Sequence, residues 1–457
     1  MKTKMGTKLV AAILSVSMLF GTTSVNAATI AEKNTGIELE IYAEGAYSNW
    51  DGVSNVSQFV NEKGQFCFAY DNGKNVIVAK TKNGKVQKNT IKLKKKHDLF
   101  GGVTCDSKGN YYLVTGETNE TEDTSKNTIF ISKYDKNGKH VKTVGDNGSA
   151  SLGWWYDSSF YTKIPFDGGN CDLAINGNTL TVNYARQMYS GHQSNSVFTI
   201  NTQTMEKLSV GNVYNSHSFA QRAIPYKDGF VLASEGDCYP RAFTINYVAK
   251  DGSFNYEGDS FHFWVKKGAL VEWNMWLVND NFARMGGVAA VNDTTVCLVG
   301  QSVKALDKKA EKQSEQVFIQ IFDPTKDLGS ASAYVTSGKR SGLSGGNGDE
   351  EVTDYGVKWL TNTDKSIISN TQVVSDGNGT IVVLFEQYAS KTWEYEGVYY
   401  IILDEKGNVV SKKQKYSATA QLNPYVMPVY TKGSVYWIGN KSGDSSNKMY
   451  VYSLKVN

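Results

Sequence analysis

The chain has 457 residues, with 48 Lys and Arg against 45 Asp and Glu. The first 27 residues hold three of the lysines and no acid, so the remaining chain has 45 basic and 45 acidic residues. This balance gives no support for binding to a nucleic-acid backbone, which needs a basic face, and no nucleic-acid partner is predicted.

The N-terminus has the pattern of a secretory signal. Lys2, Lys4 and Lys8 form a basic start, residues 9–20 are apolar, and Val25-Asn26-Ala27 is a small-x-small cleavage pattern. The apolar run is too short for a spanning helix, and no other stretch approaches that length. We therefore expect a signal peptide over residues 1–27, cleavage after about Ala27, and a secreted, extracellular protein without a transmembrane segment.

Five cysteines occur, at an odd number and without a CxxC spacing: Cys67, Cys105, Cys171, Cys238 and Cys297. This pattern argues against a zinc site and against a full disulfide framework. We expect most of them to be small buried hydrophobic side chains. A Cys105–Cys171 disulfide is the alternative, because both residues fall at nearby positions of adjacent repeats.

A repeated pattern of short strands dominates the rest of the chain. It is clearest between Gly101 and Val144, where four runs rich in β-branched and aromatic residues are joined by a tight turn, a polar loop and a second tight turn. The runs cover residues 102–106, 110–114, 128–134 and 139–144. Helical periodicity is nearly absent, and a four-stranded unit repeated every few tens of residues is typical of a β-propeller.

The repeat predicts one all-β domain over residues 28–457, a seven-bladed β-propeller of four-stranded antiparallel blades. The blades are expected near residues 56–93, 98–145, 170–210, 216–257, 284–335, 371–416 and 423–456. The last unit has only three strands, so we expect a strand at 37–43 to pair with it and close the ring. Residues 259–283 and 336–370 have room for hidden strands, which leaves six or eight blades as alternatives.

The two faces of such a ring should differ. We name the strands of a blade A to D from the channel outward. Successive strands run antiparallel, so the A–B and C–D connections share one face, the turn face, and the B–C and D–A connections share the other, the long-loop face. Most A–B and C–D connections are tight glycine turns. Long B–C and D–A loops are expected at 116–127, 145–169, 187–196, 259–283, 302–315, 336–370 and 388–397. Long loops persist where they serve binding, so the long-loop face is predicted to be functional.

Polar residues at the starts of A strands and the ends of B strands should meet at the channel mouth on this face. The ligand-binding candidates are Asn170, Arg186, His192, His217, Gln221, Arg222, Asp237, Tyr239, Arg241, Arg284 and Gln372. Arginine together with tyrosine and asparagine suits a polar or anionic sugar. The alternative is a solvated mouth whose charges pair with one another, with arginines neutralising Glu235 and Asp237.

Acid–base chemistry has its own candidates near the same mouth. They are Glu117, Glu235, Asp237, Glu386 and His217, because paired carboxylates are the groups that cleave glycosidic bonds. Tryptophans in the long loops can stack on sugars or cover the blades. No cofactor and no metal site are predicted. Calcium is the ion the sequence leaves open, since Asp376–Gly379 and Gly345–Glu351 resemble calcium loops loosely, but hairpin turns and a solvated loop are favoured.

The strand–turn–strand repeat resembles that of secreted bacterial β-propeller proteins. The Trp-Asp and Gly-His signatures of one large propeller class are missing, as are Ser-x-Asp-x-Gly-x-x-Trp boxes. The resemblance therefore implies an architecture and no particular ligand. We predict a monomeric extracellular module that binds a glycan or cell-surface polymer on the long-loop face. A glycan-active hydrolase or lyase is the alternative, and a protein-interaction scaffold is the second alternative.

Overall fold

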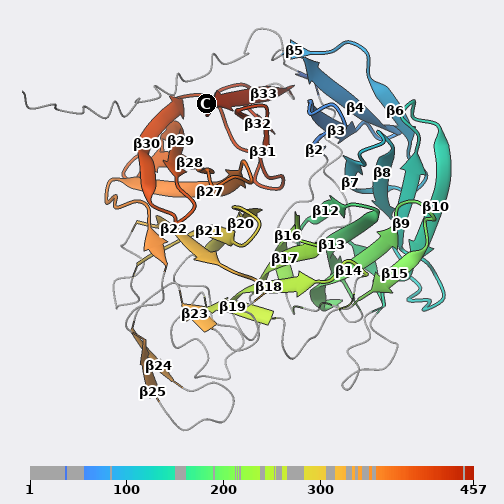
Figure 1. Ribbon diagram of the computed structural model, residues 1–457, viewed down its shortest axis with the longest axis horizontal. Coiled ribbons are helices and arrows are strands. Elements are labelled where there is room, and N and C mark those ends of the chain that lie inside the picture. The colour runs from blue at the N-terminus through green and yellow to red at the C-terminus, as the bar shows by residue number, and fades with distance from the viewer. Residues whose placement is uncertain are drawn as a thin grey trace, which may run out of the picture.

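The computed structural model is a ring of β-sheets around a central channel (Figure 1). The residues that it describes are 37–38, 56–82, 85–149, 161–188, 191–211, 213, 215, 218–236, 242–251, 253, 260–264, 283–304, 314–325, 332–334, 338–341, 349–352, 357–445 and 448–456.

Seven four-stranded antiparallel sheets form the blades, as the repeat predicts. Within each blade the strands follow chain order from A to D, except that the D strand of the seventh comes from the N-terminus. In blade order the A to D strands are β2 (Val56–Val60), β3 (Phe66–Asp71), β4 (Asn75–Lys82) and β6 (Ile91–Lys94); β7 (Leu99–Cys105), β8 (Tyr111–Gly116), β9 (Ile129–Tyr134) and β10 (His140–Asp146); β12 (Cys171–Asn176), β13 (Thr179–Gln187), β14 (Gln193–Asn201) and β15 (Lys207–Val210); β16 (Ser218–Tyr226), β17 (Gly229–Gly236), β18 (Ala242–Val248) and β19 (Ser260–Trp264); β20 (Arg284–Ala290), β21 (Val296–Ser302), β22 (Gln316–Phe322) and β26 (Lys358–Trp359); β27 (Ser366–Ser375), β28 (Ile381–Ala389), β29 (Tyr395–Leu403) and β30 (Val409–Ser417); β31 (Val429–Thr431), β32 (Ser434–Gly439), β33 (Lys448–Lys455) and β1 (Ile37–Glu38).

The remaining strands decorate this ring. β5 (Lys85–Val86) pairs with β4, and β11 (Ile164–Pro165) pairs with the end of β13. β23 (Ser332–Tyr334) runs parallel to β19 on the outside of blade four, and β24 (Gly338–Ser341) forms a separate hairpin with β25 (Asp349–Val352).

The ring closes as predicted from the three-stranded last unit. Ile37 of β1 pairs with Met449 of β33, and Glu38 pairs with Lys448. The N-terminal strand thus becomes the outer strand of blade seven. This pairing ties the two ends of the ring together and covers a sheet edge that would otherwise remain open.

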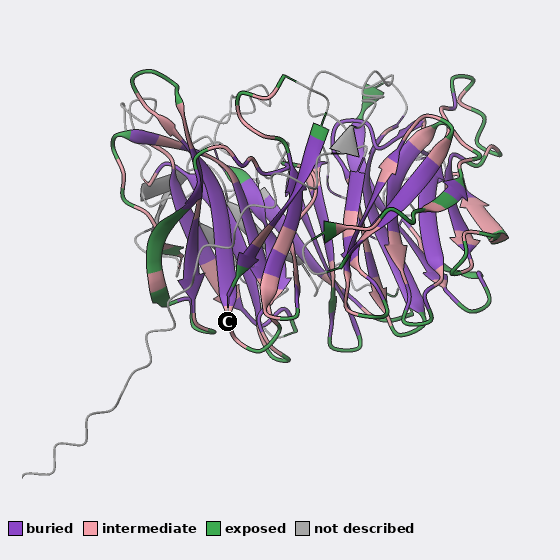
Figure 2. Cartoon of the chain, turned by 90° about the horizontal axis from the view of Figure 1, so that it is seen from above, coloured by how far each residue is buried: buried purple, intermediate pink, exposed green. Residues whose placement is uncertain are grey.

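Hydrophobic clusters lie between neighbouring blades and hold the ring together. The seven junctions each have one such cluster among the described residues. Between blades six and seven, for example, Leu384 and Tyr400 pack with Trp437 and Tyr452, all fully buried. Burial follows the strands, whereas exposed residues gather at the turns and on outer strands (Figure 2). Non-directional burial of this kind is the main stabilising term in folding.

The turn face uses one hairpin design repeatedly. In five turns an Asp or Asn side-chain oxygen accepts the backbone N–H groups two and four residues later, at 2.8 to 3.0 Å. The residues are Asn61, Asp106, Asp135, Asp376 and Asp404. The glycine three residues after each has positive φ, between 65° and 99°, which glycine adopts without strain. The Asp376 oxygen is therefore used by its own turn, in line with the hairpin prediction.

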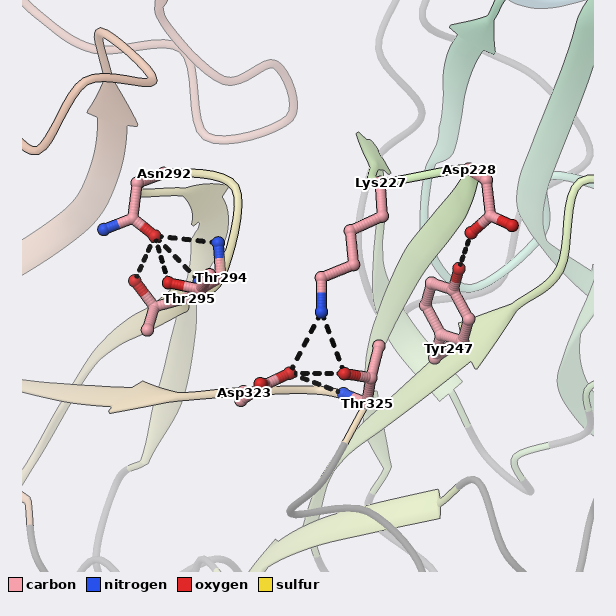
Figure 3. Close-up of polar contacts among 8 residues, drawn as sticks. All are labelled: Lys227, Asp228, Tyr247, Asn292, Thr294, Thr295, Asp323 and Thr325. Atoms are coloured by element: carbon pink, nitrogen blue, oxygen red, sulfur yellow. Dashed lines mark hydrogen bonds and ion pairs between the residues drawn. The ribbon is translucent and has the colours of Figure 1, made fainter.

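Polar contacts between blades also lie on the turn face. Lys227, in the β16–β17 turn, reaches Asp323 at 3.7 Å and the Thr325 hydroxyl at 2.9 Å, both of which follow β22 of blade five (Figure 3). Between blades seven and one, Lys432 donates to the carbonyl of Lys63 at 2.9 Å. The side chains of this face are thus largely occupied with the ring itself.

Two expected loops differ from the structure. Residues 336–370 were expected as a D–A loop, but β26 pairs with β22 and is the outer strand of blade five, so residues 323–357 form a C–D connection that leaves from the turn face. Likewise β19 supplies the outer strand of blade four within the predicted 259–283 loop. Blades four and five therefore extend beyond Glu257 and Val335, while the count remains seven.

The described cysteines carry no disulfide. Cys67, Cys105, Cys171 and Cys297 are free, so the alternative Cys105–Cys171 disulfide does not form. Burial raises the pKa of the Cys67, Cys105 and Cys297 thiols to about 12 and that of Cys171 well above its ordinary value. These thiols are inert small side chains, as expected. Cys238 lies outside the described residues.

Candidate functional site

A cavity of about 740 Å³ opens at the channel on the long-loop face. Its wall is built from the first residues of A strands and the last residues of B strands in blades three to seven, which is where the polar candidates were placed. It brings together four of the predicted ligand-binding residues and one predicted carboxylate: Asn170, Arg222, Arg284, Gln372 and Glu235.

An arginine and a glutamate from neighbouring blades meet in this wall. Arg284 starts β20, and its Nη1 lies 3.7 Å from Oε1 of Glu235, near the end of β17. The other oxygen of Glu235 accepts the backbone N–H of Met285 at 2.7 Å. Glu235 is 8% exposed along its side chain whereas Arg284 is 62% exposed, so the guanidinium is the part of the pair that faces solvent.

A second carboxyl group lies on the other side of Arg284. Gln301, the cross-strand neighbour of Arg284, donates through Nε2 to Oε2 of Glu315 at 2.5 Å. Burial raises the pKa of Glu315 to about 7, although the hydrogen bond from Gln301 and the charge of Arg284 act in the opposite direction. Glu315 therefore exchanges its proton near neutral pH, which suits either acid–base chemistry or a ligand-dependent charge.

Blade six supplies a wall whose polar groups are held from behind. Glu386 is 1% exposed and does not line the cavity. It accepts hydrogen bonds from Nδ2 of Asn370 at 2.8 Å, from the Tyr388 hydroxyl at 3.2 Å and from the backbone N–H of Leu422 at 2.7 Å. Burial raises the pKa of Glu386. Asn370 and Tyr388 do line the cavity, so Glu386 positions the groups that a ligand would meet.

An aromatic ring lies at the rim. Trp393, in the loop between β28 and β29, is 70% exposed and lines the cavity. Its φ of 60° is unusual for a bulky residue, and its N–H donates to the carbonyl of Ala389 at 2.8 Å. Trp359, another predicted loop tryptophan, instead packs on Phe318 in blade five, with ring centroids 5.7 Å apart.

Arg222 has a structural environment. It is 4% exposed, donates from Nη1 to the carbonyl of Gln221 at 2.8 Å, and its charge lowers the pKa of Asp172, which burial raises. Arg222 lines both the main cavity and a second cavity of about 570 Å³ that continues along the A strands toward the turn face. It thus lies at the boundary between a polar upper channel and a largely apolar lower one.

Other predicted residues have different surroundings. Arg186 is fully buried and donates to Ser194 and Thr162, and Gln221 is fully buried and bonded to Asn170 across the blade junction. His192 is exposed outside the cavity wall. Glu117 bonds at 2.6 Å to Nδ1 of His97, whose ring stacks on a phenylalanine. His217, Asp237, Tyr239 and Arg241 lie outside the described residues.

Sequence reasoning missed Glu315, Asn370 and Tyr388 as site residues. Glu315 was placed at the end of a loop, yet it directly precedes β22 and so stands at the start of a C strand on the long-loop face. A rule that included C-strand starts as well as B-strand ends would have found it. Asn370 and Tyr388 gain their place from Glu386, and that contact has no signal in the sequence.

Neither a metal cluster nor a membrane span is found in the described part of the chain. No three His, Cys, Asp or Glu side chains there are arranged to hold a metal ion. Within the same ranges no helix has the length and apolar character needed to cross a bilayer.

Comparisons with known proteins place the chain among propellers by fold. No protein-family model matches it, and no curated protein sequence does. Similar solved structures include the polysaccharide lyase Uly1 (11% identity, 93% of this chain and 98% of that chain covered, TM-score 0.46) and the WD40 repeats of RRP9 (11%, 92% and 98%, 0.42). The propeller of Dos1 is also similar (10%, 90% and 82%, 0.43).

Proposed function

We propose that this protein is an extracellular ligand-binding β-propeller whose cavity on the long-loop face holds a sugar residue of a glycan or cell-surface polymer. The observation that carries the proposal is the exposed Trp393 at the rim of a polar cavity. An indole face stacks on the C–H face of a sugar ring, while groups deeper in a pocket bind its hydroxyls.

The conformation of Trp393 supports a binding role. An exposed indole gains little from folding, and a left-handed backbone at a bulky residue is unfavourable by about 1–3 kcal/mol. Neither property stabilises the ring. Both are understandable if the indole is held out for a ligand. The other exposed large hydrophobic residues among those described, Val141, Leu208, Val409 and Val410, lie on outer strands, away from the cavity.

The cavity wall also supplies what sugar hydroxyls need. Carboxylates at Glu235 and Glu315 and amides at Asn370 and Gln372 stand within one enclosure. Each is fixed by neighbours, so little side-chain entropy is lost when a ligand binds. The size of about 740 Å³ lies in the range of small-molecule sites and suits one or two sugar rings.

A glycan-array screen of residues 28–457 tests the proposal, with product analysis on every hit. Trp393→Ala should lose the hits of the wild-type chain. Val410→Ala is the matched control, because Val410 is also 70% exposed but lies on an outer strand, and it should retain them. An empty array for the wild-type chain would contradict glycan binding and leave the protein-interaction scaffold as the better account.

A hydrolase or lyase is the second candidate, and Glu315 is the observation that favours it. A carboxyl group with a pKa of about 7 can donate and accept a proton at neutral pH, and Glu235 stands on the far side of Arg284 as a second carboxyl group. If products appear on the array, Glu315→Gln should abolish cleavage while binding remains. Cleavage that survives this substitution would exclude Glu315 as the acid or base.

A further inference from the structure

The hydrogen-bond polarity of the cavity wall is one-sided. Four amide side chains line the cavity, and in each the N–H end is directed to a protein acceptor. Nδ2 of Asn170 donates to the carbonyl of Gln221, Nε2 of Gln301 donates to the carbonyl of Ile368, Nδ2 of Asn370 donates to Glu386, and Nε2 of Gln372 donates to the carbonyl of Asn423. The donors of these amides are therefore used within the protein.

Gln372 shows what this leaves in the wall. It is 1% exposed, and its Nε2 faces two backbone carbonyls, of Asn423 and Val426, which settles which end of the amide is nitrogen. Its Oε1 has no hydrogen-bond partner among the described residues. A buried acceptor without a donor is unfavourable, and a ligand that brings an N–H or O–H group would satisfy it.

The charges of the wall point the same way. Arg222 is offset by Asp172 below the cavity, so the charges left at the mouth are Arg284, Glu235 and Glu315. With Glu315 ionised, two carboxylates flank one guanidinium, and the group has one negative charge in excess. A cation in the cavity would balance it, whereas an anion would add to the repulsion.

We propose that the cavity selects its sugar by hydrogen-bond donors and positive charge, so that the ligand is an amino sugar with a free ammonium group. The ammonium would lie between Glu235 and Glu315, with its ring against Trp393 and a donor directed at Oε1 of Gln372. This inference rests on the proposed function, since it names the class of sugar for the same cavity.

Titration calorimetry at pH 7 tests the inference with three kinds of tetrasaccharide. The ligands are those of glucosamine and galactosamine, their fully N-acetylated forms, and the corresponding uronates. At least one free-amine ligand should bind about tenfold or more tightly than its acetylated and uronate counterparts, as expected for hydrogen bonds to a charged group. Glu315→Gln should weaken that ligand about tenfold and leave binding of the acetylated form within about twofold.

Arg284→Gln provides an arm that does not depend on the first variant. Removing the competing guanidinium should tighten binding of the free-amine ligand a few-fold, whereas it would abolish binding of an anionic sugar held by that arginine. Tightest binding of a uronate, or equal binding of free and acetylated forms, would overturn the amino-sugar inference and leave glycan binding in place. Absence of binding by all three kinds, together with an empty array, would overturn both.

Discussion

The turn face and the long-loop face use the same kind of side chain in opposite ways. On the turn face, carboxylates such as Asp106, Asp135 and Asp404 accept backbone N–H groups, and these bonds hold their pKa values below the ordinary range. At the cavity, burial raises the pKa of Glu315 and Glu386 instead.

The difference shows where each face contributes. A carboxylate whose ionised form is hydrogen-bonded in the fold stabilises the folded chain, whereas one that is desolvated without full compensation destabilises it. The turn face is therefore built for stability. The cavity keeps groups that the ring does not need, which is the pattern expected of a functional site.

Loss of a turn carboxylate should have the largest effect. Asp106 is 8% exposed and accepts the N–H groups of Lys108 and Asn110, the Asn110 amide and the Tyr112 hydroxyl. Asp106→Ala should lower the free energy of unfolding by about 3–4 kcal/mol in urea titration, because several donors lose their acceptor. Asp135→Ala, in an exposed turn of the same design, should lose less. Equal losses would break the link between burial and turn stability.

The pH dependence of stability should separate the two faces. The folded pKa of Glu315 is about 7, above the 4.5 of the unfolded chain, so its contribution falls as the pH rises from about 4.5 to 7. Glu315→Gln should remove this loss and raise stability at pH 8 by up to about 3 kcal/mol relative to wild type. The opposite sign holds for Asp106, whose contribution is lost as the pH falls through its lowered folded pKa. Urea titrations at pH 3, 5 and 8 measure both, and an unchanged difference between pH 5 and 8 in Glu315→Gln would contradict the cavity environment described for this residue.

The rim tryptophan should matter to the ligand and little to the fold. Trp393→Ala should weaken the best glycan about 30-fold, near 2 kcal/mol, since stacking and burial of the indole are lost. Its melting temperature should stay within a degree or two of wild type, because the indole is exposed. A large drop in melting temperature with unchanged affinity would assign Trp393 to the structure of the loop.

Ring closure should have the smallest effect of the four. Only two residue pairs join β1 to β33. Ile37→Pro removes a backbone donor from this edge and should lower the unfolding free energy by about 1 kcal/mol, with Ile37→Val as the control. Ligand affinity should be unchanged, because the cavity lies among the starts of A strands. A loss of affinity would mean that the closing strand acts on the cavity.

The propeller was predictable because each level of the pattern agrees with the next. Turns such as Asp404 to Asn408, alternating strands and a three-stranded last unit all indicate the same ring, and the closing strand followed from counting edges. The outer strands of blades four and five were not predictable in this way. β26 has only two residues, Lys358 and Trp359, and its role depends on pairing with β22 across a connection of more than thirty residues.

The location of the site was predictable, and its chemistry only in part. Loop lengths indicated the face, and A-strand starts such as Arg284 and Gln372 do line the cavity. Burial decided the rest. Arg186 is fully buried in blade three and Arg222 is matched to Asp172, whereas Glu315 gains its altered pKa from tertiary surroundings that strand periodicity does not encode.

A crystal structure with the best ligand from the glycan screen tests the central claim most directly. The account predicts a sugar in the long-loop cavity, its ring on Trp393 and its donors within hydrogen-bond distance of Glu235, Glu315 and Oε1 of Gln372. A sugar bound on the turn face or on an outer strand, with the cavity holding only water, would contradict it.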